Sequence, residues 1–236
     1  MALRARGWFV SFDDPHVSLA DARARGAADE DGERAADVIL LATPVDAALA
    51  WLSQWSAAAP GGATVTSVCS VMAPLRALAH DDFVAGHPMA GSERQGLAAA
   101  SATLFEGKNW FLDHRDELVE AVVRDCGANA DFVDAEEHDR AVALVSHLPQ
   151  VLSTALAAYL GEHESALRFA GTGLETFLRL AGSDASVWRP VLDANAANVA
   201  PHAKAVADLA QKIIGGDGEA FERARRVWQQ LSSARS

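Results

Sequence analysis

Short apolar runs alternate with helix-period segments over the first half of the chain. Runs rich in β-branched and aromatic residues predict strands at residues 8–12, 38–43, 64–68, 82–85, 109–112 and 131–133. Segments of helical period separate most of them, at residues 18–25, 45–55, 72–80 and 115–125. Strands that alternate with helices are typical of a largely parallel sheet with helices on its faces. We therefore expect residues 1–134 to form an α/β domain.

The pattern changes near residue 135, after which no run predicts a strand. Helices are expected at residues 140–160, 165–180, 187–214 and 218–233, so residues 135–236 are predicted to form an all-α domain. Pro149 lies inside the first of them and lacks the N–H group that would bond to the Val145 carbonyl, so a kink is expected there. The apolar stripes of these helices present more apolar surface than one layer of helices can bury. We therefore expect a homodimer that forms through these helices.

Composition and charge narrow the class of protein. Half of the 236 residues are apolar, which is enough for a substantial core. The net charge of −12 repels phosphate groups and argues against nucleic acids and anionic membranes as partners. We expect no membrane-spanning run and no signal peptide, hence a cytoplasmic protein that acts on a small molecule. Cys69 and Cys126 have no metal-site or disulfide-framework spacing, and we predict no metal.

The most unusual run is Gly-His-Pro-Met-Ala-Gly-Ser-Glu at residues 86–93, directly after a predicted strand. Ligands bind at the carboxyl ends of strands in parallel sheets, and the Gly and Pro neighbours restrict where the imidazole of His87 can lie. His87 is therefore a candidate general acid or base. A turn histidine that bonds to a nearby carbonyl group is an equally supported interpretation.

A polar flank accompanies the apolar stripe of the helix predicted at residues 140–160. Gln150 and Thr154 lie three and seven positions after His147, so the three side chains share one flank. Such a flank suits the wall of a cleft. Taken alone, it is more often a solvated helix face.

Two further residues carry possible chemistry. Arg179 lies in an apolar segment, and a guanidinium so placed requires an anion, either a protein carboxylate or a substrate carboxylate. Ser70 follows a predicted strand, where its hydroxyl is available to a ligand. Both signals are weak by themselves.

Together, these segments resemble the prephenate and arogenate dehydrogenases of tyrosine biosynthesis. Residues 86–93 resemble the catalytic-histidine signature of that family, and Ser-His-Leu-Pro at 146–149 and Arg-Leu-Ala-Gly-Ser-Asp at 179–184 follow in the family's order. The resemblance covers nearly the whole chain. It implies a Rossmann-like nucleotide-binding domain followed by a helical dimerisation domain. The implied activity is the NAD-dependent oxidative decarboxylation of prephenate or arogenate.

The resemblance also implies a role for each matching residue. His87 draws off the proton of the substrate's ring hydroxyl as hydride leaves, and Ser70 supports that hydroxyl. Asp13, at the end of a predicted strand, binds the ribose hydroxyls of NAD and repels the extra phosphate of NADP. The other implied site residues are Arg179, His147, Gln150, Glu93 and Trp188 for the substrate, and Thr43 and Pro44 for the cofactor.

The sequence departs from the family in two turns. No Gly-x-Gly-x-x-Gly occurs in the 236 residues, and residues 1–7 resemble the end of the helix that follows such a turn, with Gly7 as its terminal glycine. We therefore expect the chain to begin after the first strand and the glycine loop. The family's Asp-x-Gly-Ser-x-Lys turn is Ser-Val-Cys-Ser-Val-Met at residues 67–72.

These departures leave alternatives to a dehydrogenase. One is a non-catalytic relative that keeps the dimeric helical domain but cannot bind the dinucleotide. A weaker one is another two-domain reductase that acts on a hydroxy acid or an imine.

Overall fold

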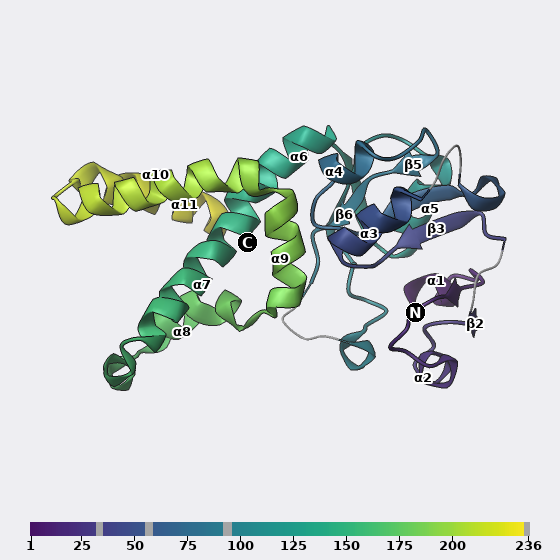
Figure 1. Ribbon diagram of the computed structural model, residues 1–236, viewed down its shortest axis with the longest axis horizontal. Helices are drawn as coiled ribbons and strands as arrows, with labels where there is room; N and C mark the ends of the chain where they lie inside the picture. The colour runs from purple at the N-terminus through teal and green to yellow at the C-terminus, as the bar shows by residue number, and fades with distance from the viewer. Residues whose placement is uncertain (32–34, 55–58, 92–95, 234–236) are drawn as a thin grey trace.

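The computed structural model describes residues 1–31, 35–54, 59–91 and 96–233 (Figure 1). Strands and short helices gather at one end of the molecule, and the later helices extend from them as an arm. The predicted order of an α/β part and then an all-helical part is confirmed. The expected division after residue 134 falls at the N-cap of helix α6 (Ala135–Val142).

The strands form three hydrogen-bonded groups. Strand β1 pairs with β2 in parallel, β3, β4 and β5 pair in parallel, and β7 pairs with β6 antiparallel and with β8 in parallel. Ala85 joins the second group to the third, because its carbonyl accepts a bond from Asp113 N at 3.0 Å. The six predicted strands are present, and β2 and β6 are additional. Their bounds are Ser11–Phe12, Glu30–Asp31, Val38–Leu41, Thr64–Ser67, Phe83–Val84, Gly86–Pro88, Asn109–Leu112 and Asn129–Phe132 for β1 to β8.

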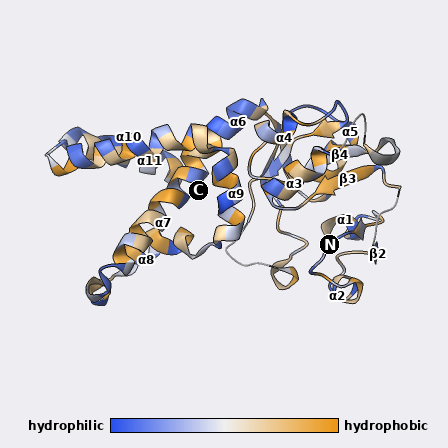
Figure 2. Ribbon diagram, viewed as in Figure 1, coloured by the Kyte–Doolittle hydropathy of each residue, from blue (hydrophilic) through white to orange (hydrophobic). Residues whose placement is uncertain are grey.

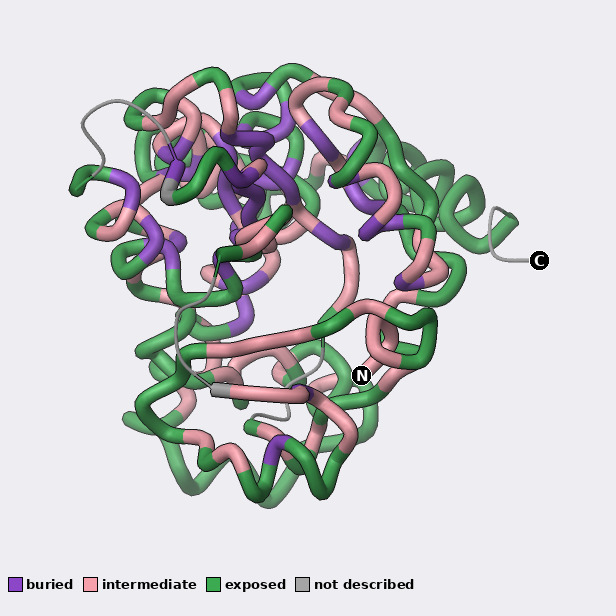
Figure 3. The backbone as a smooth tube through the Cα atoms, turned by 90° about the vertical axis from the view of Figure 1, so that its right-hand side faces the viewer, coloured by how far each residue is buried: buried purple, intermediate pink, exposed green. Residues whose placement is uncertain are grey.

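Helices cover both faces of the sheet. Successive strand residues point to opposite faces, so neighbouring residues pack against different helices. Phe83 packs with α3 (Val45–Leu52) and α4 (Ala73–Arg76), whereas its neighbour Val84 packs with α5 (Glu117–Asp125). Figure 3 shows that the buried segments gather in this part of the molecule. The carboxyl ends of β3 and β4 therefore lie at the edge of a well-packed scaffold.

The first residues pack against this scaffold. Helix α1 (Ala2–Ala5) is followed by Gly7 at φ +91°, which confirms the predicted helix end. The indole nitrogen of Trp8 donates to Asp125 on α5 at 2.8 Å. Helix α2 (Leu19–Ala24) begins at the cap Ser18. In the described part of the chain no strand joins β1 to β3, so the sheet is interrupted there.

The arm is built from longer helices with irregular joints. Residues Ala143–His147 form a π-helical segment just before Pro149, where a kink was expected. The single helix expected at 187–214 is wrong, because the chain breaks at Asn195 (φ −115°, ψ 16°). The remaining helices are α7 (Leu148–Gly161), α8 (Thr172–Leu178), α9 (Ala185–Ala194), α10 (Ala196–Ile214) and α11 (Gly218–Ser233), with 3₁₀ turns at Pro60–Gly62, Leu97–Ala99, Glu164–Phe169 and Arg179–Gly182.

One helical stretch contradicts the expectation that no apolar run reaches bilayer length. Ala135–Gly161 is long and apolar enough to cross a membrane by length and composition, and 33% of its apolar window is buried. Core helices of globular proteins meet the same criterion. This stretch also carries the buried polar side chains of His138, Asp139, His147 and Gln150. The absence of a membrane partner stays a prediction.

Candidate active site

His87 lies on strand β6 and not in the turn that the sequence suggested. Its strand pairs antiparallel with β7, so that His87 lies opposite Phe111. Gly86 permits this close approach, because a Cβ atom there would lie 2.7 Å from the Ser67 carbonyl oxygen. The glycine thus lets β6 cross the end of β4 and fixes where the imidazole begins.

A chain of hydrogen bonds runs from His87 into the protein interior. Its Nδ1 atom lies 2.9 Å from Nε2 of His138, whose Nδ1 atom lies 2.8 Å from Oδ1 of Asp139. The Asp139 carboxylate also accepts bonds from the backbone N–H groups of Met72 and Ala73, at 2.8 and 3.0 Å. The partner of His87 is therefore a second imidazole, where the turn interpretation expected a carbonyl group.

Sequence reasoning missed His138 and Asp139. Both are buried, each with 2% of its surface exposed, on α6. The only signal was that both belong to a run of five ionisable residues, 136–140, at the start of the apolar stripe, and nothing in their spacing indicated contact with a strand 50 residues earlier.

His147 is the second buried imidazole of the site. Its Nδ1 atom lies 3.0 Å from Nδ2 of Asn195, which also donates to the Asp139 carbonyl at 2.9 Å. The Nε2 atom of His147 is buried and has no partner among the described residues. The rings of Trp188 and His147 are nearly perpendicular, with centroids 5.9 Å apart.

Burial keeps both rings neutral. Desolvation, followed by the nearby His138 and His147, lowers the pKa of His87 from 6.5 to about 3. Desolvation likewise lowers the pKa of His147 to about 4, although the Asp139 carboxylate opposes this shift. Both histidines are therefore uncharged at neutral pH, with one proton and one lone pair on each ring.

The flank of α7 holds the turn that contains Arg179. Gln150 Nε2 donates to the Leu180 carbonyl at 2.9 Å, and Ser153 accepts from Ala181 N at 3.1 Å. His147 and Gln150 are buried, so the interpretation of this flank as a solvated face is wrong for these two residues. Only Thr154, one turn further on, is exposed.

The expected burial of Arg179 is wrong. Its side chain is exposed and forms no ion pair with any residue that the structure describes. The apolar neighbours in sequence do not enclose it, because no residue of the 3₁₀ turn Arg179–Gly182 is buried. Water can solvate the guanidinium, so its charge alone does not require an anion.

The remaining predicted residues follow the ends of strands. Asp13 is exposed just after β1, Thr43 and Pro44 are exposed between β3 and α3, and Ser70 is half-buried between β4 and α4. Glu93 lies outside the described residues. Within the described ranges, no three His, Cys, Asp or Glu side chains form a group that could hold a metal ion.

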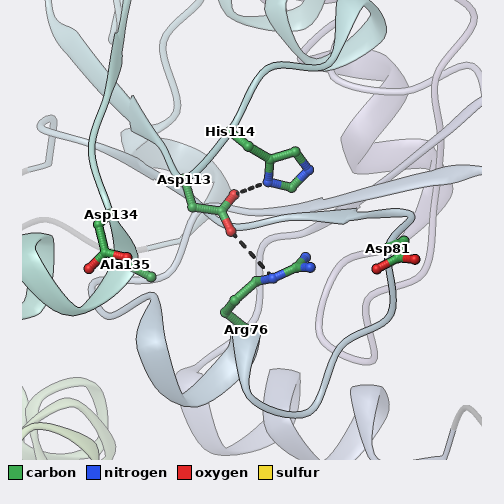
Figure 4. Close-up of a pocket in the computed structure, with 6 residues that line it drawn as sticks. All are labelled: Arg76, Asp81, Asp113, His114, Asp134 and Ala135. Carbon is green, nitrogen blue, oxygen red and sulfur yellow. Dashed lines mark hydrogen bonds and ion pairs between the residues drawn. The ribbon is translucent and has the colours of Figure 1, made fainter.

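A polar cavity of about 470 Å³ lies apart from these residues (Figure 4). Inside it, Asp113 meets Nδ1 of His114 at 2.8 Å and Nε of Arg76 at 3.7 Å. None of the predicted site residues lines this cavity. Its lining residues are Arg76, Asp81, Asp113, His114, Asp134 and Ala135.

Comparison with known families accounts for both parts of the chain. A model of the prephenate dehydrogenase nucleotide-binding domain matches residues 1–129, and a model of the prephenate dehydrogenase dimerization domain matches residues 134–223. The chain belongs to the prephenate dehydrogenase family. The α/β part is thus a nucleotide-binding domain, and the arm is a dimerisation domain.

Individual members of the family agree with this assignment. The chain is 29% identical to the prephenate dehydrogenase of Lactococcus lactis over 220 residues, 85% of this chain and 62% of that protein. It is 30% identical to the prephenate dehydrogenase of Bacillus subtilis over 179 residues, 68% and 48% of the two chains. The chain thus spans less than two thirds of these relatives. The Aquifex aeolicus prephenate dehydrogenase, solved with hydroxyphenyl propionate and NAD+, superposes with a TM-score of 0.81 at 26% identity, over 99% of this chain and 92% of that one.

Proposed function

We propose that this protein catalyses the NAD-dependent oxidative decarboxylation of prephenate or arogenate. One observation carries the proposal. His87 and His147 are both joined by hydrogen bonds to Asp139, through His138 and through Asn195. Each bond uses the Nδ1 atom of the ring, and Nε2 of His147 is buried without a partner among the described residues. Two neutral imidazoles whose Nε2 atoms are not used in these bonds suit a substrate with a hydroxyl and a carboxylate.

His147 offers a donor. Asn195 Nδ2 uses its two hydrogens on the Asp139 carbonyl and on His147 Nδ1, while its Oδ1 atom accepts from Asn198 at 2.8 Å. Nδ1 of His147 is therefore an acceptor, and the proton of the neutral ring is on Nε2. This buried N–H group suits a carbonyl or carboxylate oxygen of the substrate.

His87 is the proposed base. It takes the proton of the ring hydroxyl on Nε2 while the carbon that bears the hydroxyl loses hydride. The bond to the ring carboxylate then breaks, carbon dioxide leaves, and the released electron pair completes an aromatic ring. Arg179 is proposed to bind a substrate carboxylate, since its guanidinium is free of ion pairs with the described residues. Ser70, Gln150 and Trp188 are proposed to complete the substrate pocket, together with Glu93.

NAD, when bound, accepts the hydride. Residues of this chain fit parts of that cofactor: Asp13 is an exposed acid after β1, which suits ribose hydroxyls, and Thr43 and Pro44 are exposed at the carboxyl end of β3. The 236 residues contain no Gly-x-Gly-x-x-Gly, so they provide no glycine-rich turn whose backbone N–H groups bind the pyrophosphate. NAD is preferred over NADP because Asp13 repels a 2′-phosphate.

The arm is proposed to form a homodimer. It matches a dimerisation domain, and large apolar side chains are exposed along it. Figure 2 shows that hydrophobic residues recur along the helices of the arm. A cytoplasmic location and the absence of nucleic-acid and membrane partners belong to the same proposal. No observation favours a non-catalytic relative or a reductase for other substrates. The most exposed apolar residues on the arm are Val145, Tyr159, Phe169, Ile214, Phe221 and Trp228.

The test is turnover of prephenate and of arogenate, supplied separately with NAD and followed by NADH absorbance and by release of carbon dioxide. It is run on residues 1–236 and on the same residues preceded by a strand and a Gly-x-Gly-x-x-Gly turn. The second protein is needed because residues 1–236 contain no such turn. NADH and carbon dioxide formed in equal amounts support the proposal. NADH without carbon dioxide would indicate a simple dehydrogenase, and neither product from either substrate would contradict the proposal.

A further inference from the structure

We propose that His138 and Asp139 are positioning residues that fix the tautomer of His87, with the proton on Nδ1 and the lone pair on Nε2. The catalytic consequence of this inference rests on the proposed function, whereas the tautomer itself does not. The argument begins at Asp139 and follows the hydrogen bonds outward.

Asp139 is an anchored acceptor. Its carboxylate receives the backbone N–H groups of Met72 and Ala73, which come from the chain entering α4. These donors and the 2% exposure of the side chain hold both oxygens in place. An ionised carboxylate only accepts hydrogen bonds, so the ring nitrogen of His138 that faces Oδ1 must carry a proton.

The proton positions then follow from one ring to the next. In the neutral form of the His138 ring, a proton on Nδ1 leaves a lone pair on Nε2. Nδ1 of His87 lies 2.9 Å from that lone pair and must be the donor. The two rings meet edge to face, at 82° with centroids 5.1 Å apart, so they do not stack. Neutral His87 is left with its lone pair on Nε2, as a general base requires.

The same hydrogen bonds also stabilise the positive charge that His87 carries after it accepts a proton. Once Nε2 of His87 accepts a proton, the ring becomes a cation in a site that burial makes unfavourable for one. Asp139 is the nearest anion along the chain of hydrogen bonds, two bonds from His87. Among the described residues, His138 from α6 and His147 from the π-helical segment act on the charge of His87, and Asp139 bonds to His138 and not to His87 itself.

Asp139 influences the second imidazole as well. Its backbone carbonyl holds Nδ2 of Asn195, which donates to Nδ1 of His147. Through His138, the carboxylate of Asp139 thus places the lone pair of His87 on Nε2. Through Asn195, its backbone carbonyl places the proton of His147 on Nε2. One residue sets an acceptor and a donor in the same site.

The test reads the tautomer directly. ¹⁵N–¹H correlation spectra of histidine-labelled protein, residues 1–236, identify which ring nitrogen of His87 carries hydrogen, without substrate or cofactor. The wild-type chain is expected to show the proton on Nδ1. In Asp139→Asn we expect the amide oxygen to replace Oδ2 and accept from Ala73 N–H, so that the NH2 group replaces Oδ1 and donates to Nδ1 of His138. We expect this substitution to invert both rings and place the proton of His87 on Nε2.

Kinetics measure the consequence. Replacing the buried Asp of a serine-protease triad with Asn lowers kcat about 10⁴-fold through the same tautomer change. For Asp139→Asn we expect kcat to fall about a hundredfold or more, with KM within about threefold of wild type. His138→Gln retains an oxygen that can accept from Nδ1 of His87, so we expect the wild-type tautomer and a smaller loss of kcat. This second variant keeps the test valid if Asp139→Asn does not fold.

Asp113→Asn is the matched control, because Asp113 is also a buried carboxylate that bonds to a neighbouring histidine and to a backbone N–H, that of Ala85. It should leave the tautomer of His87 unchanged. A wild-type His87 with its proton on Nε2, or an Asp139→Asn protein whose His87 keeps the proton on Nδ1, would overturn the inference. An inverted tautomer with unchanged kcat would instead contradict His87 as the base and so remove the catalytic part.

Discussion

The side-chain amide of Asn195 donates to Nδ1 of His147 at 3.0 Å, and Asn195 itself lies at the break between α9 and α10. Helix α9 ends at Asn195, and the side chain of Asn195 bonds to the π-helical segment Ala143–His147 at its last residue. The break that the sequence did not predict therefore orients a buried imidazole of the candidate site. The first prediction follows from this contact.

Asn195→Asp replaces the donor with an acceptor of the same shape. His147 must then place its proton on Nδ1, and Nε2 loses the hydrogen that it offers to a substrate oxygen. We expect affinity for prephenate to fall at least about tenfold and the free energy of unfolding to fall by about 1 to 3 kcal/mol. Calorimetric titration and denaturant unfolding measure the two effects. Asn129→Asp, at an exposed position on β8, is the control, and equal affinities in the two variants would show that His147 does not bind the substrate.

The two neutral histidines make stability depend on pH. Their pKa values are about 6.5 in the unfolded chain but about 3 for His87 and about 4 for His147 in the folded protein. Between these values the unfolded chain binds more protons, so the free energy of unfolding falls as the pH is lowered from about 6.5 toward 4. The slope reaches about 1.4 kcal/mol per pH unit for each histidine.

His147→Gln should lower the slope of the free energy of unfolding against pH by the contribution of one histidine. Urea unfolding at several pH values measures this slope. His163→Gln, at an exposed position, is the control for the loss of a histidine. A slope that is the same in wild type and His147→Gln would show that His147 is not held neutral by burial.

Arg179→Lys tests the proposed carboxylate contact. A lysine cannot make the planar two-pronged bond of a guanidinium, so KM for prephenate should rise about tenfold while kcat changes less. Stability should stay the same, because Arg179 is exposed. If the melting temperature falls and KM does not change, Arg179 is a structural residue.

The exposed apolar surface of the arm predicts a dimer. Trp228 on α11 is 68% exposed, together with several other large apolar side chains. Light scattering at micromolar concentration should give twice the 24.9 kDa mass of the chain. Trp228→Glu should shift the protein toward monomer, whereas Arg225→Glu, on the same helix, should not. A wild-type monomer would contradict the proposed interface.

Local patterns were sufficient for most elements of the fold. Alternating runs located the six predicted strands. Strand β6 was missed because Gly86 and Pro88 are typical of turns, while its pairing depends on β7, over twenty residues later. Pairing between distant segments leaves no local signal.

The candidate site was anticipated only in part. The Gly and Pro neighbours of His87 indicated a fixed imidazole, and the polar flank indicated His147. The contact from His138 to His87 depends on how α6 docks on the sheet, which periodicity does not determine. The burial of Arg179 was wrong for a related reason, since apolar neighbours in sequence need not surround a side chain in an open arm.

The most direct test of the account is the turnover number of His87→Asn, measured with prephenate and saturating NAD in the polypeptide that carries the added glycine-rich turn. Asparagine keeps the polar character of the side chain but cannot take up the hydroxyl proton. We expect kcat to fall about a hundredfold or more, with the melting temperature and substrate affinity close to wild type. A folded His87→Asn protein with unchanged kcat would show that another group removes the proton, and the central claim would be wrong.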